Sequence, residues 1–410
     1  MSFSALNLCD ELLKAVAEQG YTTPSPIQIE AIPAVLSQRD VMAVAQTGTG
    51  KTAGFTLPMV QLLSGATTSQ AHSIRALVIT PTRELAAQVA ESIKHYSRHM
   101  NIRAAAVFGG VRIEPQIAEL QAGLDVLVAT PGRLIDLYNQ QAINFDQLEI
   151  LVLDEADRML ELGFIDDIRQ IQTLLPNQRQ TLMFSATFSK DIKSLANSML
   201  NNPVVIEVTA ANSVVETITQ KLYPVVKEYK SDLLIYLIKF NSWHQVLVFS
   251  RTKQGADNLV VTLKNAGINA ESIHANRTQH ARTLALDGFK NGTIKVLVAT
   301  DIASRGIDIS QLPCVVNFDL PYVAEDYVHR IGRTGRIGTA GLAVSFFSED
   351  EAKQLASIER VIGYPLQREI IAGFAPLAPA SSPFDDDEFG NFEPDAKRQH
   401  KGKSKGRRKR

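Results

Sequence analysis

Short runs of β-branched and aliphatic residues alternate along the chain with longer segments of helical periodicity. In the first half such runs occupy residues 41–45, 76–80, 126–130, 150–154 and 181–187. Continuous apolar runs of this length are typical of strands buried on both faces. Residues 84–99, between two of them, have apolar positions at helical spacing. The alternation predicts βαβ units, a mostly parallel sheet, and ligands bound beyond the carboxyl ends of its strands.

The same pattern begins again after about residue 215, with apolar runs at 245–250, 295–300, 314–319 and 342–347. The sequence VLVAT occurs at both 126–130 and 296–300, each time before a loop that contains Gly and Arg. This equivalent placement favours two related domains. We therefore predict an α/β protein with a first domain at 1–210, a linker at 211–216 and a second domain at 217–373.

Composition and charge change character at the end of the chain. The whole chain has 410 residues, 45% of them hydrophobic, which is enough for two cores. Residues 374–410 have no apolar periodicity, and an acidic stretch in them precedes a basic one, which predicts a disordered tail. Nine of the 42 Lys and Arg lie in residues 397–410, where no acidic residue occurs, so 33 basic residues face 43 acidic ones in the rest. Any nucleic-acid binding must then come from a local cleft or from the basic tail. Instead of binding nucleic acid, the tail could keep the protein soluble or contact an acidic protein.

The cysteines and the N-terminal segment indicate in which compartment the protein is expected. The two cysteines, Cys9 and Cys314, are far apart and lack metal-ligand spacing. The N-terminal segment lacks a basic region followed by an apolar stretch, and no apolar run is long enough to span a membrane. We predict a cytoplasmic protein without disulfides and without a membrane partner.

A phosphate-binding loop is predicted directly after the first apolar run, where the sequence reads AQTGTGKT before a helical segment. Glycines there let backbone N–H groups point at a phosphate, while the lysine reaches the terminal phosphates and the last threonine can ligate Mg²⁺. Ala45 stands where the general pattern has its first glycine, and an ordinary glycine-rich turn is the alternative. The candidate residues are Ala45, Gln46, Thr47, Gly48, Thr49, Gly50, Lys51 and Thr52.

A carboxylate pair is predicted at the end of the run at 150–154, in the sequence ILVLDEAD. Strand alternation would send Asp154 and Glu155 in different directions. One could then hold hydrated Mg²⁺ while the other orients or deprotonates the attacking water, as phosphoryl transfer to water requires. An acidic helix N-cap is the alternative for this pair.

A basic cluster, HRIGRTGR, follows at 329–336, with three arginines and two glycines. Like charges held so close together imply that the loop binds an anion. A solvated basic loop is the alternative for an isolated cluster of this kind.

These motifs together resemble the DEAD-box RNA helicases, whose name is the tetrapeptide at 154–157. The resemblance runs from about Phe3 to Phe347, and the short insertions and basic tail are similar to the bacterial RhlE-type subgroup. Further motifs in family order are YTTPSPIQ (21–28), PTRELA (81–86), GG (109–110), TPGR (130–133), SAT (185–187), VFSRT (248–252), TDIASRGIDI (300–309) and YVHRIGRTGR (327–336).

The resemblance implies two tandem RecA-like domains that bind ATP with Mg²⁺ and close around it. It implies that residues 1–29 contain the adenine-reading motif, in which Gln28 hydrogen-bonds the base and Phe3 and Tyr21 lie near it. It also places Asp308 at the ribose and Arg333 and Arg336 at the γ-phosphate. Residues implied to couple the ATP state to domain contact are Asp157, Ser185, Thr187 and His329.

The remaining motifs are implied to contact RNA. Helix N-termini, small hydroxyls and arginines suit phosphate and 2′-OH groups, which predicts binding without sequence specificity. Ala275 and Asn276 stand where the family often has a glycine, which leaves the local loop detail open. The implied RNA contacts are Pro81, Thr82, Arg83, Gly109, Gly110, Thr130, Pro131, Gly132, Arg133, Arg251, Gln279, Arg282 and Thr300.

The predicted function is an ATP-dependent RNA helicase that hydrolyses ATP to ADP and phosphate and locally unwinds short duplexes or remodels ribonucleoproteins. A second hypothesis is an ATP-regulated clamp on RNA that serves as a platform for protein assembly. A third is a DNA translocase. Expected partners are single-stranded or short duplex RNA, and ribonucleoprotein or RNA-degradation proteins.

Overall fold

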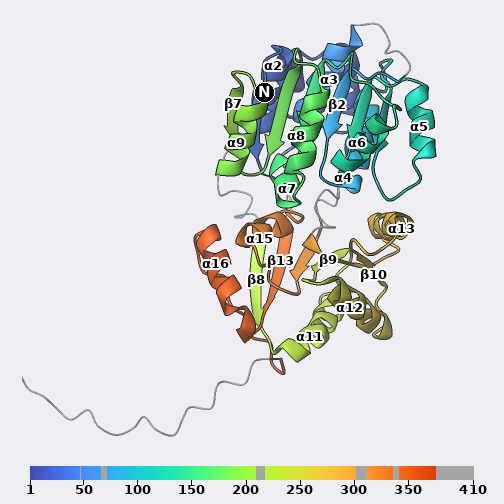
Figure 1. The fold of residues 1–410 in the computed structure, drawn as a ribbon. Coiled ribbons are helices and arrows are strands. Elements are labelled where there is room, and N and C mark those ends of the chain that lie inside the picture. The colour runs from blue at the N-terminus through green and yellow to red at the C-terminus, as the bar shows by residue number, and fades with distance from the viewer. Residues whose placement is uncertain (47, 66–71, 209–217, 302–311, 336–340, 375–410) are drawn as a thin grey trace, which may run out of the picture. The chain divides into compact units, whose positions relative to one another are not determined.

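The computed structural model describes residues 1–46, 48–65, 72–208, 218–301, 312–335 and 341–374. In these residues the strands form two sheets, and every strand pair is parallel. The predicted α/β class with parallel sheets is confirmed (Figure 1). The predicted linker and all but the first residue of the predicted tail lie outside the described residues, so the domain boundaries stay predictions.

The first sheet has the strand order β3-β4-β2-β5-β6-β1-β7. Its strands are β1 (Val41–Ala45), β2 (Ala76–Ile79), β3 (Ala104–Val107), β4 (Val126–Ala129), β5 (Ile150–Leu153), β6 (Gln180–Ser185) and β7 (Val204–Val208). The helical elements of this half are η1 (Phe3–Leu6), α1 (Asp10–Glu18), α2 (Pro26–Leu36), α3 (Lys51–Ser64), α4 (Arg83–Tyr96), α5 (Glu114–Gln121), α6 (Pro131–Asn139), α7 (Ala156–Glu161), α8 (Ile165–Leu174) and α9 (Lys190–Met199).

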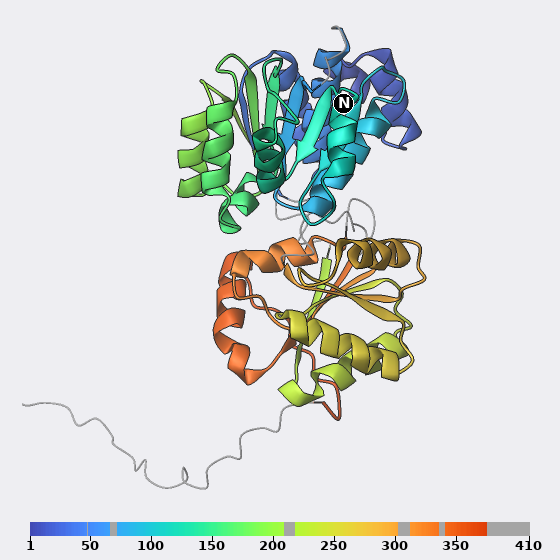
Figure 2. The ribbon, with the colours of Figure 1, turned by 45° about the vertical axis from the view of Figure 1, so that its right-hand side comes forward.

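Helices cover both faces of this sheet, which explains its continuous apolar strands. In β1, Val41 and Ala43 pack in one core with α2, α3 and α4. The alternate residues Met42 and Val44 pack in a second core with α6, α7, α8 and α9. Figure 2 shows these two helical layers with the strands between them. Because both faces of the sheet are covered, the polar residues lie at the ends of the strands.

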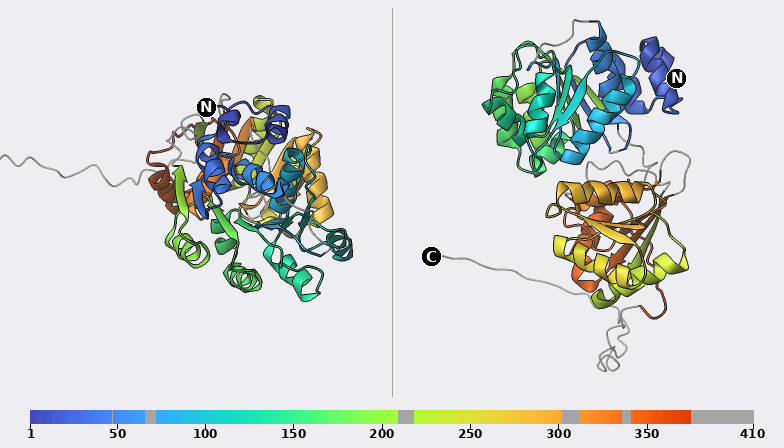
Figure 3. Two further views of the ribbon diagram at one scale, coloured as in Figure 1. Left: turned by 90° about the horizontal axis from the view of Figure 1, so that it is seen from above. Right: turned by 90° about the vertical axis from the view of Figure 1, so that its right-hand side faces the viewer.

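The second sheet has the order β10-β11-β9-β12-β13-β8. In the right-hand view of Figure 3, the golden helix α13 and the yellow helix α12 lie on opposite sides of its strands, and these two helices belong to different cores. The elements are β8 (Ile218–Pro224), η2 (Lys227–Tyr229), α11 (Lys230–Phe240), β9 (Val246–Phe249), α12 (Lys253–Asn265), β10 (Ala270–Ile273), α13 (Gln279–Lys290), β11 (Val296–Ala299), β12 (Cys314–Asn317), α15 (Ala324–Ile331), β13 (Gly341–Phe347), η3 (Glu349–Glu351) and α16 (Ala352–Ile362).

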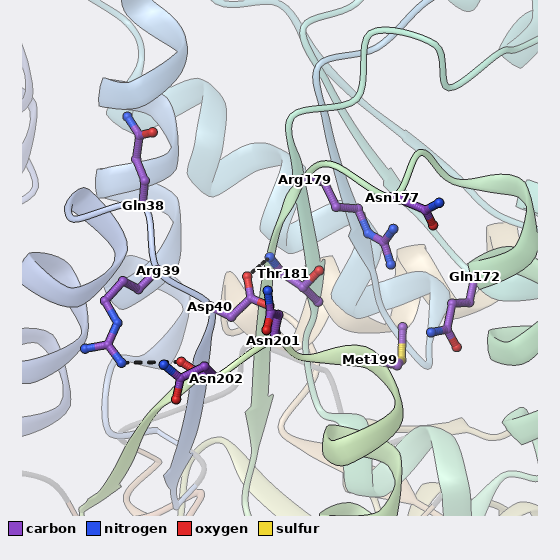
Figure 4. Close-up of a pocket in the computed structure, with 10 residues that line it drawn as sticks. All are labelled: Gln38, Arg39, Asp40, Gln172, Asn177, Arg179, Thr181, Met199, Asn201 and Asn202. Atoms are coloured by element: carbon purple, nitrogen blue, oxygen red, sulfur yellow. Dashed lines mark hydrogen bonds between the residues drawn. The ribbon is translucent and has the colours of Figure 1, made fainter.

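Asp40 precedes β1 and links it to the start of β6 and to the turn before β7, at the amino end of the first sheet. Its carboxylate accepts hydrogen bonds from the backbone N–H of Thr181 (2.8 Å) and of Asn201 (2.7 Å). Beside it lies a polar pocket of about 520 Å³, to which the α2–β1, α8–β6 and α9–β7 connections contribute (Figure 4). The pocket lies at the end of the sheet opposite to the phosphate loop, so we assign Asp40 a structural role.

Replacing Asp40 by alanine is expected to lower the free energy of unfolding by about 2–4 kcal/mol, because two backbone donors lose a charged acceptor. Urea unfolding of the full chain measures this change. Asp146→Ala, at an exposed carboxylate, is the matched control and should unfold like the wild type. If Asp40→Ala unfolds at the wild-type midpoint, the carboxylate does not hold these turns.

Candidate nucleotide and RNA site

The phosphate loop joins β1 to the N-terminus of α3, as predicted. Gly48 and Gly50 have φ angles of 84° and 93°, a region that favours glycine. A Cβ on Gly50 would lie 2.4 Å from Nε2 of Gln28, so a side chain there would also clash. Thr49 Oγ1 donates to the carbonyl of Gln46 at 2.7 Å and tightens the turn. Thr47 lies outside the described residues.

Gln28 links the adenine-reading segment to this loop. It is buried at the third position of α2, where its Oε1 accepts from the backbone N–H of Ser25 at 3.0 Å. Its Nε2 donates to the carbonyl of Gly50 at 3.1 Å. Phe3 packs in the core beside α2, whereas Tyr21 is 54% exposed. The contact of all three side chains with adenine stays a prediction.

Lys51 is buried at the start of α3, with 7% of its surface exposed. Its Nζ donates to the carbonyl of Ala45 at the end of β1. Burial lowers the pKa of Lys51, and the carboxylates of Asp154 and Glu155 oppose that change. The ammonium group of Lys51 is therefore within the electrostatic influence of both predicted catalytic carboxylates.

The two carboxylates follow β5, but strand alternation does not separate them, and that part of the prediction is wrong. The strand ends at Leu153, and Glu155 has the left-handed φ of 54° at the entry to α7. The N–H of Glu155 donates to Asp154 Oδ1 at 3.0 Å. Burial, together with the charge of Glu155, raises the pKa of Asp154 to about 7, against the opposing effect of Lys51. A strained non-glycine residue beside a desolvated carboxylate is typical of a functional site.

The predicted coupling residues of the first half come together. Asp157 Oδ2 accepts from the N–H of Ala186 at 3.1 Å, which joins α7 to the segment after β6. Ser185 Oγ donates to the carbonyl of Thr187 at 2.8 Å. His329 lies on α15. The segment after β6 is thus fixed to the same turn that presents Glu155.

The implied RNA residues of the first half lie at the carboxyl ends of neighbouring strands. Thr82, after β2, caps α4 by accepting from the N–H of Leu85 at 3.2 Å. Thr130, after β4, is the N-cap of α6, whose first residue is Pro131. Because β2 pairs with β4, two helix N-termini point toward the same edge of the sheet.

Two arginines, Arg83 and Arg133, lie at this edge of the sheet. A Cβ on Gly110 would lie 2.0 Å from Nη1 of Arg83, so the guanidinium packs directly against the Gly109–Gly110 turn. Arg133 is buried, and its Nη2 donates to the carbonyl of Val111 at 2.9 Å. Its buried Nη1 has no hydrogen-bond partner among the described residues. Such a donor is available to a phosphate oxygen.

In the second half, Thr300 follows β11, Arg251 follows β9, and both Gln279 and Arg282 lie in the first turn of α13. Gln279 Nε2 donates to Glu84 Oε1 at 3.0 Å, and Arg282 Nη2 lies 2.9 Å from Glu84 Oε2. Both side chains thus share one acceptor, and Glu84 is a functional candidate that the sequence reasoning did not single out. Its presence in the PTRELA motif was the available signal.

Arg330 of the basic cluster has an internal partner and is not part of an anion-binding group, whereas the assignment of Arg333 and Arg336 to the γ-phosphate stays a prediction. Arg330 is 2% exposed and binds both carboxylate oxygens of Asp301, at 2.6 and 2.8 Å. It also donates to the carbonyl of Asp319 at 2.7 Å, so its role is internal. Arg333 is 8% exposed. Arg336 and Asp308 lie outside the described residues.

Comparison with known proteins decides the family. Two family models match, DEAD/DEAH box helicase over residues 25–195 and helicase conserved C-terminal domain over residues 229–338. RhpA of Helicobacter pylori strain B128, a DEAD-box ATP-dependent RNA helicase, is 42% identical over 361 residues, which are 88% of this chain and 72% of the relative. The chain belongs to the DEAD-box ATP-dependent RNA helicases. The ATP-dependent RNA helicase RhlB of Pseudomonas syringae pv. tomato is 40% identical over 90% of this helicase and 94% of the relative.

Solved structures agree with this assignment. Dbp5 of S. cerevisiae bound to RNA and ADP BeF3 is similar to the helicase with a TM-score of 0.81 and 32% identity, over 90% of this chain and 95% of that chain. The two parallel-sheet domains are thus the tandem RecA-like pair of the family, and the helicase is an ATP-hydrolysing enzyme that acts on RNA. None of its helices within the described ranges is long and apolar enough to cross a membrane.

Proposed function

We propose that ATP bound by residues 45–52 decides how tightly this helicase holds RNA. The convergence of Lys51, Asp154 and Glu155 supports the proposal most directly, because a buried cation and two carboxylates lie near one phosphate-binding loop. Gln28 contacts that loop through Gly50, so the adenine-reading segment and the phosphate loop would respond together.

A magnesium ion fits this site. The carboxylate of Asp154 is desolvated, which disfavours its charged form, and Thr52 offers a hydroxyl in the first turn of α3. Hard oxygen ligands of this kind suit Mg²⁺. When bound, the ion would neutralise charge on the phosphates. Glu155, which has a left-handed backbone at the entry to α7, would orient the attacking water and accept its proton.

The second domain completes the reaction in this proposal. Arg333 and Arg336 would reach the γ-phosphate and stabilise its developing charge, and Asp308 would contact the ribose. Closure around ATP would then bring the two RNA-binding edges into register on one strand. RNA held in a bent form cannot stay paired, so closure would open a short duplex locally, and hydrolysis would release the strand.

The substrate in this proposal is the backbone of single-stranded or short duplex RNA, bound without sequence preference. Helix N-termini at Thr82 and Thr130 and the free donor of Arg133 support backbone contacts. The short insertions and basic C-terminal segment support the RhlE-type subgroup. The two widely separated cysteines, Cys9 and Cys314, support a reducing, cytoplasmic location. Ribonucleoprotein or RNA-degradation proteins are the proposed partners.

The enzyme and the RNA clamp differ in turnover. We expect RNA to stimulate many rounds of ATP hydrolysis, with release of a short labelled strand from a duplex in the same reaction. Stable ATP-dependent retention of RNA without repeated turnover would support the assembly platform instead. Equal stimulation by single-stranded DNA would favour the DNA translocase.

A further inference from the structure

An exposed tyrosine lies beside Arg251 at the carboxyl end of the second sheet. Arg251 follows β9, Tyr322 follows β12, and these two strands are paired neighbours. Tyr322 as a residue is 72% exposed, which is high for so large a side chain. The guanidinium carbon of Arg251 lies 4.7 Å from the centroid of that ring, within range of a cation–π contact. One face of the ring is therefore in contact with the cation.

Arg251 is held in place from the protein side. Its Nη2 lies 2.5 Å from Oε1 of Glu351, a carboxylate that is 1% exposed. Its backbone N–H donates to Asp319 Oδ2 at 2.9 Å. The guanidinium is thus oriented before any ligand arrives, so little rotamer entropy would be lost on binding.

The negative charge beneath this pair is balanced. Lys230 Nζ lies 2.7 Å from Oε2 of Glu351 and 3.6 Å from Oδ1 of Asp319. Two carboxylates therefore face two cations, Lys230 and Arg251. These two carboxylates would therefore not repel the phosphates of an approaching RNA strand as uncompensated charges would.

We propose that Tyr322 is an additional RNA-binding residue, which stacks one base of the bound strand on one face of its ring while Arg251 contacts the other face. This inference rests on the proposed RNA-binding edge of the sheet. It adds a contact with the face of one base to the backbone contacts proposed there. Every base has a π-face, so stacking adds affinity without adding sequence preference. A guanidinium and an aromatic ring are the side-chain groups on which unstacked RNA bases commonly stack.

The test is the affinity of the full-length helicase for a short single-stranded RNA in the presence of a non-hydrolysable ATP analogue. Tyr322→Ala is expected to weaken binding about 5-fold to 150-fold, and Tyr322→Phe to keep most of the affinity. Phe240→Ala is the matched control, since Phe240 is 73% exposed but ends α11, before the amino end of β9. The rate of ATP hydrolysis without RNA should stay unchanged in all three variants.

RNAs with a single abasic nucleotide separate base stacking from other contacts. For the wild type, removing the base at one position of the strand should weaken binding, whereas Tyr322→Ala should be insensitive to that same position. If Tyr322→Ala binds intact RNA as the wild type does, the inference is wrong. It is equally wrong if the variant loses the same affinity for intact and for every abasic RNA, because Tyr322 would then only support Arg251.

A failure of the proposed function gives a different result. If the wild type itself binds no RNA in any nucleotide state, the RNA-binding edge is absent and the role of Tyr322 falls with it. If the wild type binds RNA and shows no position sensitive to Tyr322, only the stacking contact is overturned.

Discussion

Replacing Glu155 by glutamine is expected to lower the RNA-stimulated ATPase rate by about 100-fold to 10,000-fold, because an amide cannot take a proton from the attacking water. The change is nearly isosteric, so the left-handed backbone at residue 155 and the N–H donated to Asp154 should persist. ATP should still bind, because Lys51 and the phosphate loop are untouched. Steady-state hydrolysis and binding of a fluorescent ATP analogue measure the two effects separately.

Glu119→Gln provides the control for this experiment, since Glu119 is exposed on α5. It should hydrolyse ATP at the wild-type rate. Wild-type turnover in Glu155→Gln would remove Glu155 from the reaction, and loss of ATP binding in that variant would assign it to nucleotide binding instead.

Lys51→Ala is expected to remove ATP binding, and turnover with it, in the concentration range where the wild type is saturated. The lysine is buried, and among the described residues its ammonium group donates to a backbone carbonyl, so a triphosphate would be the partner that best satisfies its charge. Without it, several phosphate charges would enter a desolvated site beside two carboxylates. Equilibrium binding of ATP and of ADP measures the loss, which should be greater for ATP.

Lys14→Ala, at an exposed position of α1, is the matched control and should bind both nucleotides normally. A Lys51→Ala variant that binds and hydrolyses ATP like the wild type would contradict the proposed role of the loop. Because Lys51 lies in the first turn of α3, thermal unfolding of both variants should accompany the binding data.

Much of the fold was predictable because both sheets are parallel and covered on both faces. Strands such as β1 and β11 are continuous apolar runs, which stand out from any helical pattern. Four strands were missed for local reasons. β3 (Ala104–Val107) is three alanines and a valine, and β10 (Ala270–Ile273) contains Glu271 and Ser272. The sequence of β8 is ITQKLYP, and β7 is an apolar run interrupted by Glu207. All four are edge strands of their sheets.

The candidate site was predictable in its residues and less so in its geometry. Motif spacing identifies Lys51 and Glu155, but only the structure shows that the strand ends before both carboxylates and that Glu155 has a left-handed backbone. The internal role of Arg330 was hidden as well, because nothing in a linear motif shows that Asp301 binds its guanidinium. Pairings across long sequence separations, such as Tyr322 with Arg251, are equally hidden.

The central claim is that the triphosphate decides how tightly RNA is held. It is tested most directly by the rate at which labelled single-stranded RNA leaves Glu155→Gln, measured with saturating ATP and again with saturating ADP. We expect dissociation to be at least about 10-fold slower with ATP, as a coupling free energy between the two sites requires. Equal dissociation rates with the two nucleotides would contradict it.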